Sequence, residues 1–286
     1  MGQQQQAAKW TQLSLQVESL PLPPISLLPS PSPTPPPCTQ VQAAANARLW
    51  DDSAGAFIDN PSSSLHPQDG NSLAVVYGLV QPLERAQRIS QHLSKNWNGV
   101  GARTPEWNYD IGTFPGSLEV MAHAQAGECA RSLQLMRLQW GYMLDHPNST
   151  QSTFWEGYHS DGSFAYQGIY MSNAHGWATG PVSTLSLSIL GVSPTDYGSR
   201  AWAVQPCPGD LQHAQGQLLL DGKQGYVKVA WDVQPGSGGV EFALEVDATS
   251  LAYDAAAIGA ISVPVSNASS TSITINGQVR VNHQPL

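Results

Sequence analysis

The feature that most constrains the fold is a change in hydrophobic periodicity near residue 191. Between about residues 41 and 190, apolar residues recur every three or four positions, which is typical of amphipathic helices. After Gly191 the runs are short and β-rich, most of them alternate apolar and polar residues, and Gly-rich turns separate them. This order predicts an all-α layer of packed helices followed by a β-sandwich.

The expected elements can be placed by residue number. Asp69 suits the N-cap of a first helix, and Pro82 suits the first turn of a second. The helical stripes are Leu73/Val76/Tyr77/Val80, Ala86/Ile89/Leu93/Trp97, Phe114/Leu118/Met121/Ala122 and Leu133/Met136/Trp140/Met143/Leu144, with a fifth segment at about 176–190. The expected strands are 201–204, 217–220, 226–231, 240–246 and 272–276.

The first forty residues differ from the rest in composition. A Gln run at positions 3–6 and a Pro-dense stretch at 21–37 cannot bury enough apolar surface to offset their ordering entropy. No early apolar stretch leads to a cleavage site, so no signal peptide is visible. We therefore expect a disordered Gln/Pro-rich tail over 1–40, a helical domain over 41–195 and a β domain over 196–286.

Charge and motif searches exclude several functions. The net charge of −9 without a basic run argues against nucleic-acid binding, and no apolar run approaches the roughly 20 residues of a membrane span. Phosphate-binding, zinc-protease and nucleophile-elbow signatures are absent, and no two histidines are spaced i, i+4, so we expect neither a metal nor a cofactor. Cys38, Cys129 and Cys207 are too few and too scattered for a disulfide scaffold and predict buried or idle thiols.

Carboxylates beside aromatic residues are the remaining candidates. Glu156 lies beside Trp155 and Tyr158, and the segment 103–110 contains Glu106 and Asp110. Hydrolysis of a glycosidic bond needs a carboxyl to protonate the leaving oxygen and a second one to activate water or attack. Nine Trp and nine Tyr in a chain with 12% charged residues also suit flat polyhydroxylated ligands.

Each candidate also has a structural interpretation. Thr153-x-x-Glu156 matches a capping box, and Asp69 matches a helix N-cap. Glu106 and Asp110 suit loop caps or ion-pair partners of Arg103. His175 suits a hydrogen-bonded loop histidine.

The order of the motifs resembles that of a known family. The series is Gln68-Asp-Gly-Asn-Ser-Leu-Ala-Val75, Thr153-Phe-Trp-Glu156, His175-Gly-Trp-Ala-Thr-Gly-Pro181, Pro208-Gly-Asp-Leu211, Ala214-Gln-Gly216 and a strand ending in Trp231. It is similar to the C-terminal half of the α-L-rhamnosidases, particularly the fungal-type six-hairpin enzymes. The resemblance implies a partial (α/α)6 toroid followed by a C-terminal antiparallel β-sandwich.

The same resemblance implies roles for individual residues. Glu156 matches the general base of an inverting hydrolysis that releases terminal α-linked L-rhamnose. His175 matches a histidine that contacts the sugar, Trp177 lies in the same motif, and Trp155 would shape the pocket by ring stacking. Asp69 matches a structural helix start.

The general acid of the family lies on earlier helices, so it is not identified here, and a truncated enzyme is expected. Glu106 or Asp110 would substitute for the acid only if the loop 99–112 turned inward. The alternative is a catalytically inactive truncated relative with a residual carbohydrate-binding pocket. The resemblance also suggests secretion.

Overall fold

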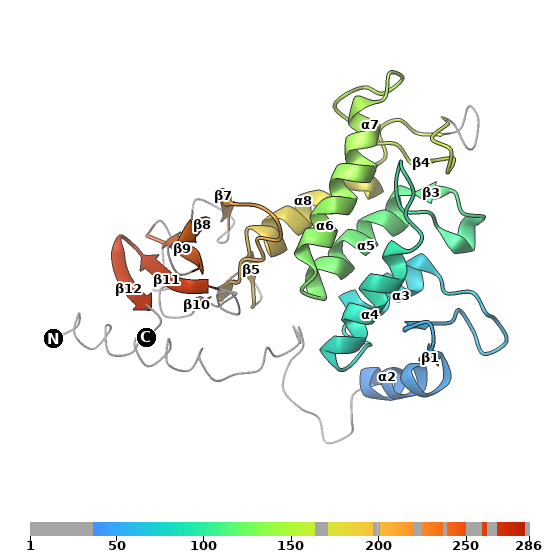
Figure 1. Cartoon of the computed structure of the whole chain (residues 1–286), viewed down its shortest axis with the longest axis horizontal. Coiled ribbons are helices and arrows are strands. Elements are labelled where there is room, and N and C mark those ends of the chain that lie inside the picture. The colour runs from blue at the N-terminus through green and yellow to red at the C-terminus, as the bar shows by residue number, and fades with distance from the viewer. Residues whose placement is uncertain are drawn as a thin grey trace. The chain divides into compact units, whose positions relative to one another are not determined.

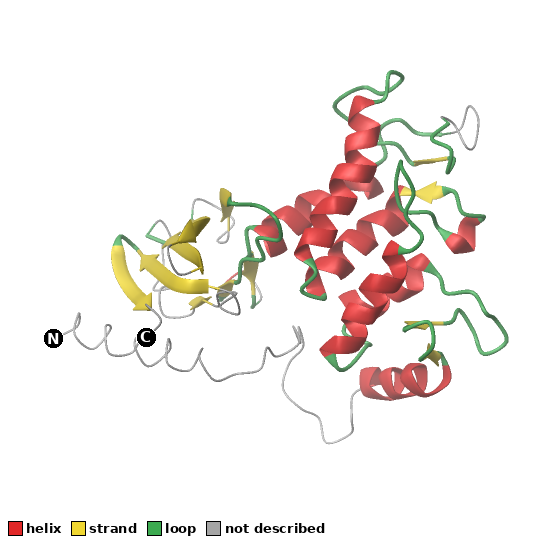
Figure 2. Ribbon diagram, viewed as in Figure 1, coloured by secondary structure: helices red, strands yellow, loops and turns green. Residues whose placement is uncertain are grey.

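The protein is described by a computed structural model that covers residues 37–163, 171–196, 199, 201–219, 225–236, 239–249, 259–261 and 268–283. These residues form two compact units that separate between Thr184 and Leu185, one mostly helical and one built from strands (Figures 1 and 2). The division precedes residue 195 because the π-helical turn η5 (Leu185–Ile189) packs on β5 (Val192–Pro194). The expected tail lies outside the described residues up to position 36, and its last residues belong to α2 (Pro37–Arg48).

Helix α5 is the centre of the first unit. The helices are α3 (Gln68–Val76), α4 (Leu83–Ser94), α5 (Thr113–Gln125), α6 (Cys129–Leu135), α7 (Gly141–Asp145) and α8 (Gly180–Thr184). Helices α3, α4, α6 and α8 all contact α5 (Figure 1). The π-helical turn η2 (Met136–Trp140) joins α6 to α7, and the 3-10 turn η4 (Gly176–Thr179) leads into α8.

Two short antiparallel strand pairs interrupt the helices, which the helical prediction did not include. They are β1 (Trp50–Asp51) with β2 (Ala56–Phe57), and β3 (Ile111–Gly112) with β4 (Gly157–Tyr158). A two-residue strand is too short to show a period of two in the sequence. The pair β3–β4 holds together two loops that are distant in the sequence.

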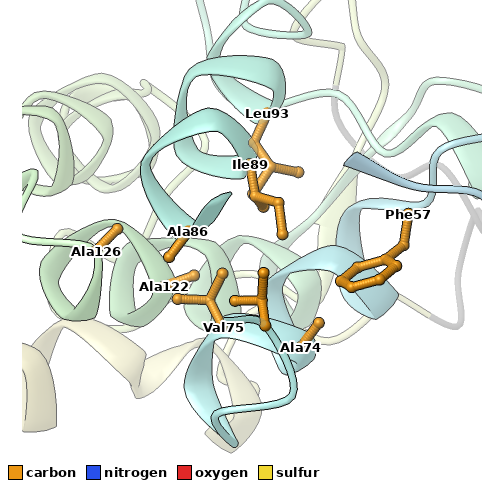
Figure 3. Packing of buried hydrophobic residues seen from close by; sticks show 9 residues of the cluster. Phe57, Ala74, Val75, Ala86, Ile89, Leu93, Ala122 and Ala126 are labelled. Carbon is orange, nitrogen blue, oxygen red and sulfur yellow. The ribbon is translucent and has the colours of Figure 1, made fainter. Parts of the chain in front are cut away.

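The apolar core of this unit lies where α3, α4 and α5 meet. Figure 3 shows Phe57 of β2 facing small side chains of α3 and α5 and the larger Ile89 and Leu93 of α4. Ala86, Ile89 and Leu93 of the predicted stripe are buried as expected, whereas Trp97, its fourth member, lies beyond the end of α4 and is half-buried. Packing small against large side chains allows helices to approach closely and fill the interior.

The predicted stripe Leu73, Val76, Tyr77 and Val80 is only partly confirmed, because Val80 is buried in the core and Val76 packs against it, whereas Leu73 is half-buried. Tyr77 is 75% exposed, and the buried face of the helix carries Gln68, Asn71 and Ser72 beside Ala74 and Val75. The Asn71 side chain accepts a hydrogen bond from the Phe57 N–H and donates one to the Phe57 carbonyl oxygen, at 2.7 and 2.9 Å. A polar side chain that satisfies the backbone of a neighbouring strand can be buried without a net cost.

Helix α5 also departs from prediction, because its buried face carries the polar Glu119 and His123 beside apolar residues, and only Ala122 of the predicted stripe is buried. The carboxylate of Glu119 accepts hydrogen bonds from Gln68 Nε2 and Trp97 Nε1, both at 2.6 Å, and lies 3.0 Å from His123 Nε2. His123 Nδ1 lies 2.6 Å from the Ser90 hydroxyl. This buried network turns α5 so that Phe114, predicted to be in the core, is exposed.

The second unit contains two sheets. Their strand orders are β12-β11-β9-β8-β7 and β10-β6-β5, with β6 (Trp202–Val204), β7 (His213–Leu219), β8 (Tyr226–Gly236), β9 (Gly239–Asp247), β10 (Gly259–Ile261), β11 (Ala268–Ile275) and β12 (Gln278–His283). The predicted alternation holds in β8, where Val227, Val229 and Trp231 are all buried.

The prediction of a wholly antiparallel arrangement is wrong, since β9 pairs with β11 and β6 with β10 in parallel. Parallel neighbours need a long crossover, and the connection after β9 supplies one. No helix in the described ranges has the length and apolar character of a bilayer span.

The structure corrects the prediction for two cysteines and explains the glycine at the change of periodicity. Cys129 and Cys207 each take part in a disulfide, so they are not idle thiols. Gly191, where the periodicity changes, has φ +87°, and a Cβ there would overlap the backbone between Gln205 and Pro206. Only glycine fits both the conformation and the space.

Candidate carbohydrate site

Two loop segments of the helical unit lie side by side and carry the predicted site residues. The His175 N–H donates to the Phe154 carbonyl oxygen at 2.9 Å, and the Thr153 hydroxyl donates to the Asn173 carbonyl oxygen at 2.7 Å. The Glu156 N–H donates to the Ser172 carbonyl oxygen at 2.9 Å. These bonds bring Glu156 and His175 together, as the resemblance implied.

The backbone of Glu156 is held from a second side by the start of α5. The Thr113 hydroxyl lies within hydrogen-bond distance of the carbonyl oxygens of both Trp155 and Glu156, at 2.7 and 2.8 Å. The Trp177 indole N–H donates to the Glu156 carbonyl oxygen at 3.3 Å. Hydrogen bonds from both neighbouring segments restrain the backbone of Glu156. The position from which its side chain extends is therefore fixed.

The Glu156 carboxylate has one anchored oxygen and one free oxygen. Oε2 accepts the Ser172 N–H at 3.1 Å and lies 3.8 Å from His175 Nδ1. Within the described residues, no group donates a hydrogen bond to Oε1. The side chain is 18% exposed, so this oxygen can meet a water molecule while most of the residue is shielded.

Two exposed aromatic rings adjoin His175, which lies near this carboxylate. The rings of Phe114 and Trp177 stack with centroids 5.4 Å apart and an interplanar angle of 27°, and Trp177 lies 4.2 Å from the His175 ring. Phe114 is 43% exposed and Trp177 is 40% exposed. We call Phe114 and Trp177 the aromatic wall. Neighbouring exposed rings of this kind mark ligand surfaces more often than isolated ones do.

The neighbouring Trp155 is fully buried and lies behind Glu156. Its ring packs edge-on against His146, Tyr158 and Tyr142, with centroids 4.8, 5.5 and 6.3 Å away. The Tyr158 hydroxyl donates to the Val100 carbonyl oxygen at 2.7 Å, and burial raises the pKa of Tyr158 well above its usual value. This aromatic cluster supports the loop that carries Glu156.

The structure decides between the two interpretations of several carboxylates. The capping-box interpretation of Thr153 and Glu156 is wrong, because no helix begins there and the next residues form β4. Asp69 is not the N-cap of α3, since Pro67 occupies that position. Short sequence patterns of this kind depend on the following residues being helical, which tertiary pairing prevents here.

Glu106 is the cap of α3 instead. Its two carboxylate oxygens accept the backbone N–H groups of Gln68 and Asp69, at 2.8 and 2.9 Å. Burial raises the pKa of Glu106, and the neighbouring Asp69 charge adds to this rise. The predicted role as a loop cap is confirmed, although the capped helix lies far away in the sequence.

Asp110 belongs to a third arrangement. Both of its carboxylate oxygens lie 3.2 Å from His159 Nδ1, across the end of the β3–β4 pair. Arg103, the expected partner, instead donates from Nε to the Asn96 carbonyl oxygen at 2.9 Å. In the described ranges, no group of three or more His, Cys, Asp or Glu residues is arranged to hold a metal ion.

The sequence prediction missed four contributors to the site. Phe114 was expected in the core, and nothing in the sequence indicated the roles of Thr113 and the Ser172 backbone amide. Ser117 completes the arrangement, since its hydroxyl donates to the Trp177 carbonyl oxygen at 3.0 Å and accepts the Gly180 N–H at 3.2 Å. No local pattern in the sequence could have indicated these contacts, which join residues between 16 and 63 positions apart.

The helical unit followed by a strand unit defines an α+β fold by domain, and known structures share it. A GH78 family rhamnosidase of Bacillus sp. GL1 matches 85% of this chain over 24% of its own length, with 23% identity and a TM-score of 0.58. An α-L-rhamnosidase from Aspergillus terreus matches 82% over 23% of its own length, with 19% identity and a TM-score of 0.53.

The predicted resemblance to α-L-rhamnosidases is therefore confirmed for the fold. The chain spans about a quarter of the length of each of these structures. No protein-family model and no curated protein matched the sequence.

Proposed function

We propose that this chain carries the base side of a rhamnosidase-like glycoside hydrolase site, with a terminal α-linked L-rhamnoside as the substrate. The observation that carries the proposal is the Glu156 carboxylate: Oε2 accepts the Ser172 N–H, Oε1 receives no hydrogen bond from the described residues, and Trp177 of the aromatic wall donates to the carbonyl oxygen of the same residue. The similarity in fold to two rhamnosidases supports it. We further propose that the helices are part of an (α/α)6 toroid and the strands part of a β-sandwich.

In the proposed inverting reaction, water attacks the anomeric carbon from the face opposite the leaving group. Glu156 Oε1 accepts the proton of this water as the new C–O bond forms. The Ser172 N–H on Oε2 keeps the carboxylate oriented. His175 contacts the sugar from beside the carboxylate, Trp177 contributes an apolar surface, and Trp155 shapes the pocket from behind.

The second proton, which the leaving oxygen requires, has no assigned donor. Glu106 uses both carboxylate oxygens to cap α3, and Asp110 faces His159. Inverting enzymes place their two carboxyl groups roughly 6.5–9.5 Å apart. The general acid is therefore proposed to lie outside the described residues of this chain.

The alternative proposal is an inactive relative that binds carbohydrate at the same place. The observation that favours it is that both acid candidates are engaged elsewhere, which leaves a base without a partner. Binding needs only the aromatic wall, His175 and the anchored carboxylate. Turnover needs a proton donor as well.

Turnover of an aryl α-L-rhamnoside by the purified chain separates the two. We expect Glu156→Gln to lower kcat at least ~10²-fold while leaving ligand binding within a few-fold, because the amide cannot accept the proton. Glu128→Gln is the matched control, since Glu128 pairs with Arg131 on α6 away from the site. Saturable binding without turnover supports the alternative, and a first-formed α-anomer contradicts inversion.

A further inference from the structure

One buried side chain at the start of α5 contacts the backbone on both sides of the proposed base. Thr113 is fully buried and is the first residue of the helix. Its hydroxyl oxygen lies 2.7 Å from the Trp155 carbonyl oxygen and 2.8 Å from the Glu156 carbonyl oxygen. A hydroxyl has one proton to donate, so these two carbonyl groups share it. One side chain is therefore tied to two successive peptide groups.

These two peptide groups meet at the Cα atom of Glu156. The first contains the Trp155 carbonyl group and the Glu156 N–H, and this N–H donates to the Ser172 carbonyl oxygen at 2.9 Å. The second begins with the Glu156 carbonyl group, which also accepts the Thr113 N–H at 3.4 Å and the Trp177 indole N–H at 3.3 Å. Because each peptide group is planar, the orientations of the two planes set φ and ψ of Glu156. They therefore set the direction in which its side chain leaves the backbone.

The carboxylate depends on this direction because it lies at the end of a side chain with three rotatable bonds. The Ser172 N–H restrains Oε2 at 3.1 Å, and a change of direction at Cα moves Oε1 relative to that contact. A catalytic group must be held within roughly 0.5 Å and 10–20° of its productive geometry. The contacts of the Thr113 hydroxyl are with backbone carbonyl oxygens, so its influence on the carboxylate passes through the backbone of Glu156.

We propose that Thr113 is a positioning residue for the general base and acts through the two peptide groups that flank Glu156. The proposal rests on the proposed function, because it assigns Thr113 a part in the reaction of Glu156. Since Thr113 is fully buried, it does not contact the sugar. Loss of its hydroxyl therefore changes the placement of the base and leaves the groups that bind the sugar in place.

Three substitutions of Thr113 test this role through the kinetics of an aryl α-L-rhamnoside, with kcat expressed per folded molecule. Thr113→Val removes the hydroxyl and keeps the shape of the side chain. Misplacement by about 1 Å costs up to about 10²-fold in rate, so kcat is expected to fall about 10- to 100-fold while KM stays within about threefold. Thr113→Ser keeps the hydroxyl and is expected to retain kcat within about threefold. Thr113→Ala also lacks the hydroxyl and is smaller, so it repeats the test if valine is not accommodated.

Ser132→Ala is the matched control. The Ser132 hydroxyl is also buried and donates to the Val120 carbonyl oxygen of α5 at 2.8 Å, about two turns along the helix from Thr113. Its loss removes a comparable hydrogen bond from the packing of α5 without touching the loop of Glu156. Ser132→Ala is expected to lower Tm about as much as Thr113→Val does, and to leave kcat and KM within about twofold of the wild-type values.

The outcomes separate this role from the proposed function. A lower Tm in Thr113→Val with unchanged kcat overturns the positioning role, and turnover that still depends on Glu156 leaves the proposed function in place. A fall in kcat that Thr113→Ser shares, or that Ser132→Ala equals, also overturns the positioning role, because the effect then does not come from the hydroxyl at this place. Lack of turnover by the wild-type chain overturns the proposed hydrolysis and the role of Thr113 together.

Discussion

Helices α8 and α5 approach closely behind the site, so a substitution that adds one methyl group tests their packing. An alanine Cβ at position 180 would overlap the Cβ of Ser117 and lie 2.7 Å from its Cα. Ser117 is buried and anchors the loop of Trp177 by two hydrogen bonds. The two helices must therefore separate by about 1 Å for Gly180→Ala to fold, given ordinary contact distances of roughly 3.5–4.0 Å.

The cost can be worked out from these contacts. Overpacking of this kind costs about 1–3 kcal/mol. Weakening the two hydrogen bonds of the Ser117 hydroxyl costs up to about 0.5–1.5 kcal/mol each. Alanine regains about 0.5–1 kcal/mol through its lower backbone entropy. We expect Gly180→Ala to lower the free energy of unfolding by about 1–5 kcal/mol, with Tm falling by roughly 2–4 °C for each kcal/mol.

Gly141→Ala is the matched control, because no atom lies within 4 Å of a Cβ at that helical position. It is expected to raise the free energy of unfolding by up to ~1 kcal/mol. Both variants are measured by thermal and denaturant unfolding followed by circular dichroism. Equal stability of the two variants would refute the close contact between α8 and α5.

Three further predictions test other parts of the structure. Glu119→Ala leaves three donors without their acceptor and is expected to lower the unfolding free energy by at least ~3 kcal/mol. Glu128→Ala, at a half-exposed ion pair, is the control and is expected to change the unfolding free energy by less than about 1 kcal/mol in the same denaturant assay. Similar losses of stability in the two variants would contradict the buried network. Because the pKa of Glu106 in the folded state is raised above its usual 4.5, its contribution to stability falls as pH rises from about 4.5 through the raised pKa. Glu106→Gln is therefore expected to reduce the pH dependence of the unfolding free energy, measured in urea between pH 4 and 7. Parallel curves of unfolding free energy against pH for wild type and variant would argue against this. Peptides that contain Cys129 and Cys207 are expected to resist alkylation until reduction, as mass spectrometry of protein from an oxidising host can show, and complete alkylation beforehand would contradict the disulfides.

The sequence by itself determined the change from helices to strands and which face of some of these elements is buried. Helix α4 and strand β8 follow their predicted patterns, with Ile89, Leu93, Val229 and Trp231 on the buried faces. In such elements, burial depends on apolar side chains spaced at the period of the element itself. That information is local, so it can be read without knowledge of the partner.

The tertiary structure alone decided which faces of α3 and α5 are buried. Gln68 and Glu119 are buried while Tyr77 and Phe114, which were predicted to be buried, are exposed. The two polar side chains can be buried because they satisfy one another. Each would be costly to bury singly, and the pair is stable only when both helices are in position. A prediction based on the hydrophobicity of single residues places both Gln68 and Glu119 on the exposed face.

The candidate site divides in the same way. The sequence motifs identified Glu156 and His175, whereas the anchored and free oxygens of the carboxylate depend on the Ser172 amide and on the β3–β4 pair. Phe114 joined the site because the polar face of α5 turned it outward. Hydrogen bonds between distant segments thus determined the geometry around Glu156, because they form only after the chain has brought those segments together.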